Sequence, residues 1–455
     1  MNYLAKLLER AVYDQVFAYV EENNILPVNQ SAYRPDHSTE TTLLKIHNDV
    51  ICSLDRKLNT VIIYLDLSAA FDTIDHGLLI SDLFMLGFRG KVLDLLSSYL
   101  EGRSVLVSCN GEKSDPRSLL FGVPQGSTMG PLLFSLYTLS LSKLLEDSQV
   151  SFQLYADDTQ LYFEFDKDHI PEMKTKLNNV LNDISKWMLS RRLKLNMSKT
   201  KIMIISPTNQ REEVLLNFDK LHYNGLEIFP CTQVKNLGVI FDSKLSFNDQ
   251  ISSVIRRCNF SLFNIKNIKK HISQPLLIKV IHSEILSRID YCNSLYFQLP
   301  KYQLKRMQTI INRAVRIIYS LPYRAHITEY MKDLHWLPLG PRIDFKYILM
   351  THKILNTDNP KYLKDFLTFN SNRQEVSRRL VQHGVSGGHK FGDRAFKYSA
   401  PRLYNKIPND VKFHTENLDL FKSSLKTYLY TEAHDYKLDS ILRYNPSNDD
   451  YTYNI

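Results

Sequence analysis

The chain has 455 residues, 44% of them hydrophobic and 23% charged, which excludes a disordered protein and leaves room for two or three domains. Lys and Arg (57) outnumber Asp and Glu (48), and the net charge of +9 favours a polyanionic partner without identifying one. The five cysteines are scattered without a CxxC pair, which argues against a disulfide framework and a zinc knuckle.

Charged side chains interrupt the N-terminal segment at Lys6, Glu9, Arg10 and Asp14, so a signal-peptide core is not expected. No apolar run approaches the length needed to span a bilayer. We therefore expect an intracellular protein of the cytoplasm and nucleus that is not secreted and has no membrane partner.

The first half of the chain alternates helical and strand-like patterns. Leucines at helical spacing predict an amphipathic helix over 3–22. The other segments that we interpret as regular structure are a helix over 39–55, a buried strand over 61–67, a turn within 68–87 that leads into a helix ending at Gly87, a helix over 90–99, a hairpin within 103–122 that turns at Asn110-Gly111, and a helix within 126–145.

Residues 150–165 then predict a strand, a tight turn and a second strand, followed by a long helix over 171–192 and a strand at the end of LKLNMSKTKIMIIS. We expect another small hairpin in 234–247, around Asp242-Ser243. Helices mixed with antiparallel strands indicate an α+β fold.

The composition changes after residue 247. Residues 248–320 are mostly helical in pattern and carry a basic face that includes Arg256, Arg257, Arg306 and Arg313. A further piece follows from 342, with a Gly- and charge-rich stretch at 384–394 and a polar tail over 445–455 that we expect to be frayed.

Three acidic residues are distinguished by their local context. Asp66 lies in a strand that is otherwise suited to burial, and Asp157 and Asp158 are adjacent within YADD between two strands. Buried carboxylates are costly unless paired or bound to metal, and a divalent cation would relieve their mutual repulsion. The alternative interpretation is a polar hairpin turn at Asp157-Asp158 and a helix N-cap at Asp66.

The segments VIIYLDLSAAFDTIDH, GVPQGSTMGPLLFSLY and YADDTQLY occur in this order and resemble the A, B and C motifs of reverse transcriptases. LNMSKTKIMI and VKNLGVIFDSKLSF resemble the D motif and the E motif, or primer grip. Each motif is most similar to the version in LINE-type non-LTR retrotransposons of the jockey and chicken-repeat group. QSAYRPDHSTETTLL, SRIDYCNSLYFQLP and FGDRAFKYSAPRLYNKIP extend the resemblance over nearly the whole chain.

The resemblance implies a right-hand polymerase with an antiparallel palm sheet, a helical thumb and a C-terminal extension. We expect fingers and palm in 1–247, with the fingers incomplete, a thumb in 248–340 and the extension in 341–455. The implied activity is an RNA-directed DNA polymerase, in which two-metal nucleotidyl transfer extends a primer 3′-hydroxyl. The implied partners are an RNA template, a DNA primer and dNTPs.

The resemblance also implies a role for each residue at a matching motif position. Asp66, Asp157 and Asp158 would be catalytic and bind two Mg²⁺ ions, with Mn²⁺ as a substitute. Phe71 would be a steric gate against the ribonucleotide 2′-hydroxyl, and its alternative role is a core Phe. Gln125 and Gly126 would line the nucleotide pocket, although the same letters also fit a plain helix-entry loop.

The remaining assignments leave their alternatives open. Tyr155 would stack near the primer terminus, or is an exposed strand Tyr. Lys199 would approach the triphosphate, or caps a helix end, with Lys201 as the other candidate. Arg34 would bind the incoming triphosphate through its planar fork, or is a surface Arg before Pro35. Asp72 and Asp75 are expected to be structural.

The family carries a first fingers motif and an endonuclease upstream of the segment that begins here, so the resemblance implies an N-terminally truncated copy. Two further functions are open: a catalytically inactive remnant that only binds nucleic acid, and an RNA-directed RNA polymerase. Phe71 and the Ala of YADD favour the reverse transcriptase over the RNA polymerase.

Overall fold

The computed structural model describes residues 3–67, 70–223, 225–369, 379–382, 392–412 and 417–435. Within it the chain forms two compact units. The first unit comprises Met1–His37, Asn59–Ile204 and Gln210–Cys231, and the second comprises Ser38–Leu58, Ile205–Asn209 and Thr232–Ile455. The chain therefore enters each unit more than once, whereas the predicted three-part division was continuous and remains a prediction.

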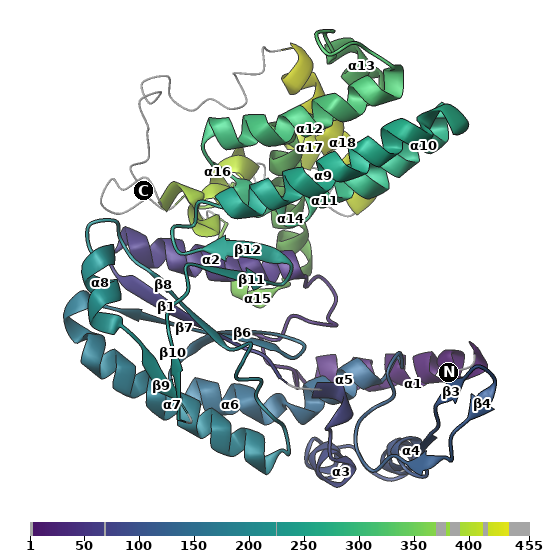
Figure 1. Cartoon of the computed structure of the whole chain (residues 1–455), viewed down its shortest axis with the longest axis vertical. Coiled ribbons are helices and arrows are strands. Elements are labelled where there is room, and N and C mark those ends of the chain that lie inside the picture. Colours follow the sequence, from purple (N-terminus) through teal and green to yellow (C-terminus); the bar gives the residue numbers. More distant parts are fainter. Residues whose placement is uncertain are drawn as a thin grey trace. The chain divides into compact units, whose positions relative to one another are not determined.

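The first unit contains a mixed set of helices and strands (Figure 1). Its α-helices and 3₁₀ turns are α1 (Tyr3–Glu22), η1 (Ala70–Asp72), α3 (His76–Met85), α4 (Lys91–Leu100), α5 (Gly130–Tyr137), α6 (Leu139–Asp147), η2 (Lys167–His169), α7 (Ile170–Ser190) and α8 (Arg211–Phe218). Its strands are β1 (Asn59–Leu65), β2 (Ser104–Val105), β3 (Ser108–Cys109), β4 (Glu112–Lys113), β5 (Arg117–Ser118), β6 (Ser151–Tyr155), β7 (Asp158–Phe165), β8 (Lys201–Ile205), β9 (Leu221–Tyr223) and β10 (Leu226–Ile228).

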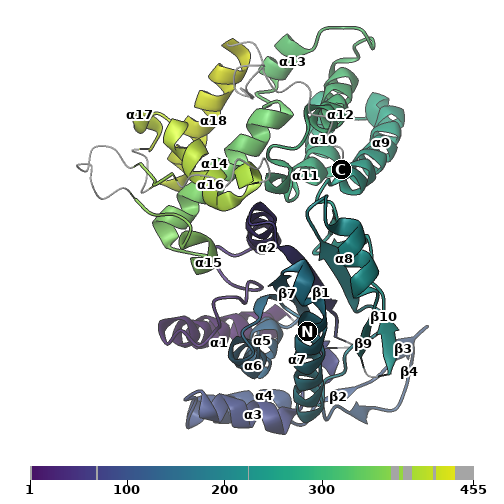
Figure 2. The same ribbon diagram turned by 90° about the vertical axis from the view of Figure 1, so that its left-hand side faces the viewer.

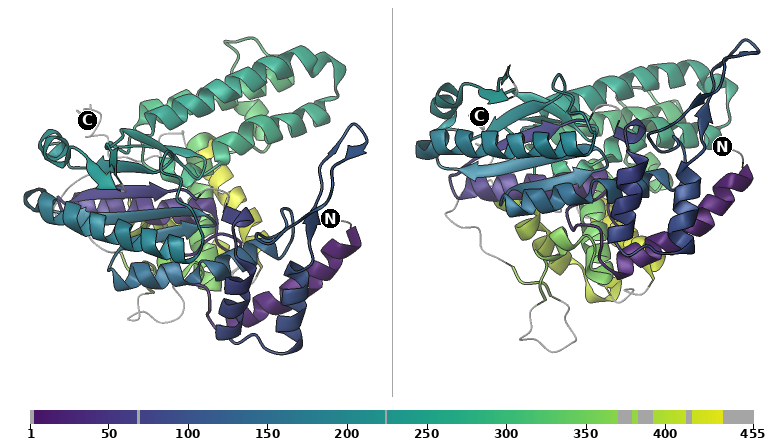
Figure 3. Two further views of the ribbon diagram at one scale, coloured as in Figure 1. Left: turned by 60° about the horizontal axis from the view of Figure 1, so that its bottom comes forward. Right: turned by 90° about the horizontal axis from the view of Figure 1, so that it is seen from below.

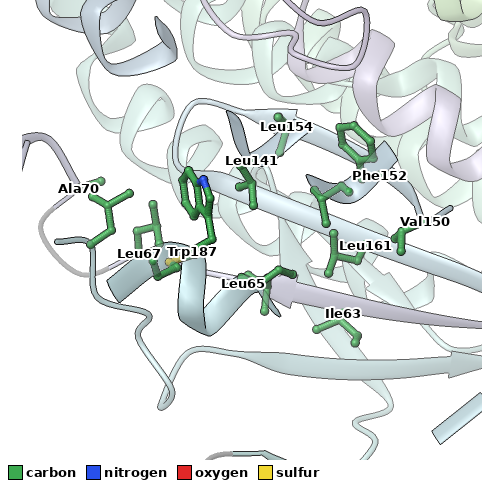
Figure 4. Close-up of a cluster of buried hydrophobic side chains, with 14 of the residues drawn as sticks. Ile63, Leu65, Leu67, Ala70, Leu141, Val150, Phe152, Leu154, Leu161 and Trp187 are labelled. Atoms are coloured by element: carbon green, nitrogen blue, oxygen red, sulfur yellow. The ribbon is translucent and has the colours of Figure 1, made fainter. Parts of the chain in front are cut away.

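The central sheet has the strand order β6-β7-β1-β8, and β7 pairs antiparallel with both of its neighbours. Every residue of β1 is buried, as its β-branched sequence predicts. Helices α6 and α7 cover one face of this sheet, and Leu141 and Trp187 from these helices lie beside Leu65 and Leu161 of the strands (Figure 4). The predicted α+β class with an antiparallel sheet is confirmed.

Helix α7 shows why this packing follows from sequence. Its buried side chains recur every three or four residues along one face: Met173, Leu177, Leu181, Ile184 and Met188. The indole N–H of Trp187 on the same face donates to Ser140 Oγ at 2.9 Å, so the polar end of this buried ring has a partner.

The arm between α4 and α5 forms the predicted hairpin. Cys109 pairs with Glu112, and the turn between them, Asn110-Gly111, has φ of +53° and +90°, values that Asn and Gly adopt most readily. The strands β3 and β4 extend away from the helices of the first unit (Figure 3). The segment 68–87 was predicted to turn away from the strand and into a helix that ends at Gly87. Within it lie the 3₁₀ turn η1 and then α3, which begins at His76 and ends at Met85.

The second unit is mainly helical. Its strands are β11 (Gln233–Asn236) and β12 (Val239–Asp242). Its helical elements are α2 (Thr39–Asp55), α9 (Asn248–Ile268), η3 (Lys269–His271), α10 (Gln274–Ile281), η4 (His282–Leu286), α11 (Ser287–Asp290), η5 (Asn293–Tyr296), α12 (Lys301–Tyr319), α13 (Thr328–Asp333), α14 (Leu339–Thr357), α15 (Lys361–Lys364), η7 (Gly392–Arg394), α16 (Phe396–Lys406), α17 (Asn409–Lys412) and α18 (Leu418–Asp435).

Helices α9, α10 and α12 pack together, and α14 packs against α12, α16 and α18 (Figure 2). Arg342 on α14 donates to Asp290 Oδ2 at 2.8 Å, and Lys346 pairs with Glu40 Oε2 at 2.7 Å. The segment from 341 onward is therefore bound into the same compact unit as the helices before it. Most of the Gly- and charge-rich stretch and the whole polar tail lie outside the described residues.

The small hairpin in 234–247 is real, but its predicted turn is wrong. β11 and β12 are joined at Leu237-Gly238, both with positive φ, and Asp242 is the last residue of β12. The Asp242 carboxylate instead accepts backbone N–H bonds from Lys244, Ser246 and Phe247 at 3.1, 3.0 and 2.7 Å. Asp242 thus ends the strand and leads into α9 rather than making the hairpin turn. Helix α8 and the β9–β10 hairpin were not anticipated.

Among the described residues, no helix is long and apolar enough to cross a bilayer.

The three backbone bonds to Asp242 predict a stability effect. Asp242→Ala leaves the buried N–H of Phe247 and two partly buried N–H groups without their acceptor, and should lower the free energy of unfolding by about 2 kcal/mol or more. Urea denaturation followed by circular dichroism would measure this. The control is Asp249→Ala, which removes an exposed carboxylate from the first turn of α9. Equal stability of the two variants would contradict the prediction.

Candidate active site

Asp66 lies at the point where β1 leaves the central sheet. Leu65 is the last residue paired with β7, opposite Thr159, so Asp66 and Asp158 each lie one residue beyond the last pair of this antiparallel ladder. The backbone carbonyl of Asp66 accepts from Asn196 N at 2.8 Å. The N-cap of α3 is Asp75, whose carboxylate accepts from Leu78 N at 2.9 Å, so the helix-cap interpretation of Asp66 is wrong.

Asp157 and Asp158 are presented by the tight turn between β6 and β7. Tyr155 pairs with Asp158, and Ala156 adopts a left-handed φ of +55° between them. The turn is supported from outside by Gln30, a buried residue whose amide oxygen accepts from Ala156 N at 3.3 Å and from Ala32 N at 3.1 Å.

Sequence reasoning missed Gln30, because nothing in a single Gln indicates a partner 126 residues away. The segment around it adds to the edge of the sheet, with Ser31 N donating to Leu154 O at 3.0 Å and Leu154 N to Asn29 O at 2.9 Å. The QSAYRP segment thus fixes the aspartate turn.

The three carboxylates share one electrostatic environment. Burial, and then the charges of Asp157 and Asp66, raise the pKa of Asp158 to about 6, and Lys199 opposes this rise. Burial is also the main cause that raises the pKa of Asp157, with a contribution from Asp66. Asp66 is 24% exposed, and its Oδ2 lies 3.2 Å from Lys199 Nζ. The structure therefore brings together the predicted catalytic residues and Lys199.

Whether these residues suit a divalent cation depends on the ligands it would use. In the part of the chain that the structure describes, no group of three or more His, Cys, Asp or Glu side chains is arranged as a metal site. Mg²⁺ usually takes only one or two protein carboxylates and completes its coordination shell with phosphate oxygens and water. Asp66 Oδ2 is shielded from water and accepts no well-aligned hydrogen bond, although the Lys199 ammonium lies close by. This donor set fits a cation, and Mg²⁺ binding remains a prediction.

The PQGST loop, residues 124–128, is anchored to the segment that follows Asp66. Val123 N donates to Phe71 O at 2.9 Å, and Gly122 N to Ile74 O at 2.8 Å. A side chain at Gly122 would meet the Asp72 backbone at 2.9 Å, so only Gly allows this approach. The ring of Phe71 is half-buried, with its centroid 4.8 Å from that of Phe134. This packing against Phe134 is what a core Phe, the alternative interpretation, would show. The role of Phe71 as a steric gate remains a prediction.

Gln125 and Gly126 form the exposed tip of this loop. Gly126 has φ of +76°, and no other atom lies within 4 Å of where its Cβ would be, so its backbone is open to a ligand. The Gln125 amide nitrogen lies 3.1 and 3.2 Å from the two carboxylate oxygens of Asp72. Asp72 and Asp75 thus have the structural contacts that were expected of them.

Arg34 is not the surface residue of its alternative interpretation. Its side chain is only 12% exposed, and its guanidinium contacts Glu21 Oε1 at 3.2 Å and the Pro27 carbonyl at 3.0 Å. It is not a surface residue, and a triphosphate contact, which remains a prediction, would have to replace the Glu21 pair. Tyr155 is half-buried at the end of β6, and Lys201 is exposed at the start of β8.

A family model described as reverse transcriptase (RNA-dependent DNA polymerase) matches residues 1–241. The chain therefore belongs to the reverse transcriptase family.

Its similar proteins are retrotransposon polymerases. It is 27% identical over 343 residues to the probable RNA-directed DNA polymerase from transposon BS of Drosophila melanogaster, covering 74% of this chain and 37% of that protein. It is 24% identical over 349 residues to the RNA-directed DNA polymerase from mobile element jockey of Drosophila funebris, covering 75% and 37%. These matches confirm the predicted resemblance to non-LTR retrotransposons, and the chain spans little more than a third of the length of these curated relatives.

Solved structures that resemble the chain include the apo telomerase of Candida tropicalis, with a TM-score of 0.37 and 12% identity over 78% of this chain and 59% of that one. The telomerase of Candida albicans in complex with a telomeric RNA fragment has a TM-score of 0.32 and 13% identity, covering 75% and 55%. Scores this low carry no argument about the site.

The raised pKa of Asp158 predicts a dependence of stability on pH. The unfolded chain ionises Asp158 near its ordinary value of 3.8, whereas the folded chain does so at about 6. Stability should therefore fall as the pH rises from about 4 to 6 and stay lower above that range. In EDTA at pH 8, Asp158→Asn should be more stable than the parent by on the order of 1–2 kcal/mol, since the group is partly solvated.

Urea denaturation at pH 8 and pH 4 tests this, because the difference should vanish at the lower pH. Asp168→Asn, an exposed carboxylate beyond β7, is the control and should leave both values unchanged. A variant at Asp158 that is less stable than the parent at pH 8 would refute the repulsion argument.

Proposed function

We propose that this protein is the RNA-directed DNA polymerase of a non-LTR retrotransposon, which adds deoxynucleotides to a primer 3′-hydroxyl on an RNA template. The observation that carries the proposal is the register of β1 and β7, which sets Asp66 beside the Asp157-Asp158 turn. In a chain of the reverse transcriptase family, three carboxylates that share one electrostatic environment support a role in nucleotidyl transfer.

Asp66, Asp157 and Asp158 would hold two Mg²⁺ ions, with Mn²⁺ as a substitute. Bound there, such ions make the primer hydroxyl more acidic and neutralise charge on the triphosphate. Lys199 is largely exposed, and its ammonium lies next to Asp66. From there it would bind phosphate of the triphosphate or supply a proton to pyrophosphate.

The other residues would shape the nucleotide site. The open backbone at Gly126 and the amide of Gln125 would contact the incoming dNTP, and Phe71 would exclude a 2′-hydroxyl. The Phe71 ring suits this task because its main chain is tied to Val123 and its ring rests on Phe134, so it cannot easily move aside. Tyr155 would stack near the primer terminus, and Arg34 would reach the triphosphate if its pair with Glu21 opens.

The helices of the second unit would bind the template–primer duplex through its backbone. Arg306 donates to Ser252 Oγ at 2.9 Å and Arg313 to Asn259 Oδ1 at 2.7 Å, so neutral side chains orient both guanidinium groups without cancelling their charge. Both cations lie on α12 and both acceptors lie on α9, and oriented cations of this kind favour phosphate contacts. A polymerase with these substrates would act inside the cell, in the cytoplasm and nucleus.

The first functional prediction concerns the paired aspartates. The double variant Asp157→Asn, Asp158→Asn should lower Mg²⁺-dependent extension of a DNA primer on RNA by at least about 10³-fold, because two anionic ligands are lost. Its affinity for the RNA–DNA hybrid, measured by fluorescence anisotropy, should remain within about threefold of the parent.

The matched control is Asp168→Asn, Asp183→Asn, which removes two exposed carboxylates and should extend as well as the parent. Normal extension by the Asp157, Asp158 variant would overturn the proposal. A parent that binds the hybrid but incorporates no nucleotide would instead favour the binding-only remnant.

The second functional prediction concerns the choice of sugar. Phe71→Val should raise the incorporation of ribonucleotides relative to deoxynucleotides by about tenfold or more, since the bulk that meets the 2′-hydroxyl is gone. Phe71→Tyr keeps the ring and should keep the discrimination. Single-nucleotide extension with matched rNTP and dNTP pairs measures the ratio, and an unchanged ratio in the Val variant would remove the gate role.

A further inference from the structure

A buried carboxylate from the N-terminal helix holds the PQGST loop. Glu9 on α1 is only 7% exposed. Its Oε2 accepts from the backbone N–H of Thr128 at 2.8 Å, and its Oε1 accepts from the hydroxyl of Tyr99 on α4 at 2.9 Å. One side chain thus joins α1, α4 and the loop, and both of its oxygens are used.

These contacts fix the C-terminal half of the loop, which makes no main-chain bond to the described residues of the motif A segment. The N-terminal half is tied to Phe71 and Ile74 through main-chain bonds at Val123 and Gly122. On the other side, Gly130 N donates to Ser127 Oγ at 2.7 Å, and Glu9 receives the N–H of Thr128. Between these anchors only the tip at Gln125-Gly126 is exposed, and Gly126 has a left-handed backbone with open space around it.

The bond between Tyr99 and Glu9 requires the Tyr99 hydroxyl to keep its proton. Burial, and then the neighbouring Glu9 carboxylate, help to raise the pKa of Tyr99 to about 12, although a hydrogen bond with Ser127 opposes the rise. The Tyr99 hydroxyl therefore stays protonated near neutral pH and keeps donating to Glu9.

Helix α1 is itself well fixed, so it can serve as an anchor. Val16 and Val20 are buried in the core of the first unit, and at the far end of the helix Glu21 pairs with Arg34 at 3.2 Å. The same helix thus uses one acidic residue near each end to contact the two segments that are expected to meet the nucleotide.

We propose that Glu9 is a positioning residue that preorganises the PQGST loop for the incoming dNTP. Glu9 does not touch the substrate: it holds the Thr128 amide, and through it the curvature that presents Gln125 and Gly126. The proposal rests on the proposed polymerase function for its kinetic consequence, while the anchoring itself can be measured without catalysis. The competing explanation is that Glu9 only stabilises the fold.

The kinetic test compares Glu9→Ala with Glu9→Gln and with the parent full-length chain. Glu9→Ala should raise KM for dNTP about tenfold while kcat stays within about threefold, because the loop must be ordered by the nucleotide itself. Glu9→Gln should recover most of the affinity, since its amide oxygen can accept from Thr128 N and its amide nitrogen can donate to the Tyr99 oxygen. Glu22→Ala, an exposed acid on the same helix, is the control.

The structural test is hydrogen exchange by mass spectrometry on peptides that cover 121–130, compared with peptides from β6 and β7. Glu9→Ala should speed exchange in the loop and leave the strands protected. Should Glu9→Ala fail to fold, Glu9→Asp replaces it, because a carboxylate shortened by one methylene cannot reach both partners. Glu9→Asp should also raise KM for dNTP and speed exchange in 121–130, each by less than Glu9→Ala.

The outcomes separate the two proposals. A folded Glu9→Ala with parental KM and parental exchange in 121–130 overturns the positioning role, as does a Glu9→Gln variant no better than Glu9→Ala. Faster exchange everywhere, at equal rates in loop and strands, shows a purely structural residue and also overturns it. If the parent extends no primer, the polymerase proposal fails, and selective deprotection of the loop still supports the anchoring by Glu9.

Discussion

The site depends on holding like charges together. The charge of Asp66 helps to raise the pKa of both Asp157 and Asp158, and Asp157 helps to raise that of Asp158, so the free protein is destabilised where these carboxylates meet. What keeps them in place is the backbone: seven paired residues between β1 and β7 set the register, and a one-residue slip would turn Asp66 to the opposite face. The energy for this comes from the core beneath, where Val61, Ile63 and Leu65 of β1 are buried in one cluster with residues of helices α6 and α7.

Support for the site from outside the sheet follows a common pattern, in which a buried polar side chain from a distant segment binds the backbone of a functional turn. Gln30 does this for the aspartate turn, and Glu9 does it for the PQGST loop. Both turns contain a residue with positive φ, Ala156 and Gly126. Gly adopts such a backbone readily, whereas at Ala156 it persists only when its surroundings hold it. Side-chain acceptors supply this hold without filling the space in front of the turn.

Periodicity and motif order were enough to predict the helices 3–22 and 39–55, the strand–turn–strand around YADD, and the convergence of Asp66 with the paired aspartates. They could not predict which of two possible turn positions the chain would use where both have turn-forming residues. In 234–247 the Asp-Ser pair has the stronger turn propensity, yet the chain turns at Leu237-Gly238. There the Tyr291 hydroxyl donates to Leu237 O at 2.7 Å and its ring packs against Gly238, a contact that no local pattern contains.

The same limit explains Arg34 and Glu9. A planar guanidinium fits a carboxylate as well as a phosphate, so residue type alone could not distinguish a pair with Glu21 from a triphosphate contact. Glu9 looked like one more charge on an amphipathic helix, although it is nearly as buried as the valines behind it.

Sequence shows which residues can do chemistry, whereas the residues that position them are recognised only when burial and a long-range partner are both known. For this reason, the substitutions most informative about the nucleotide site lie on α1 as well as in the motifs themselves.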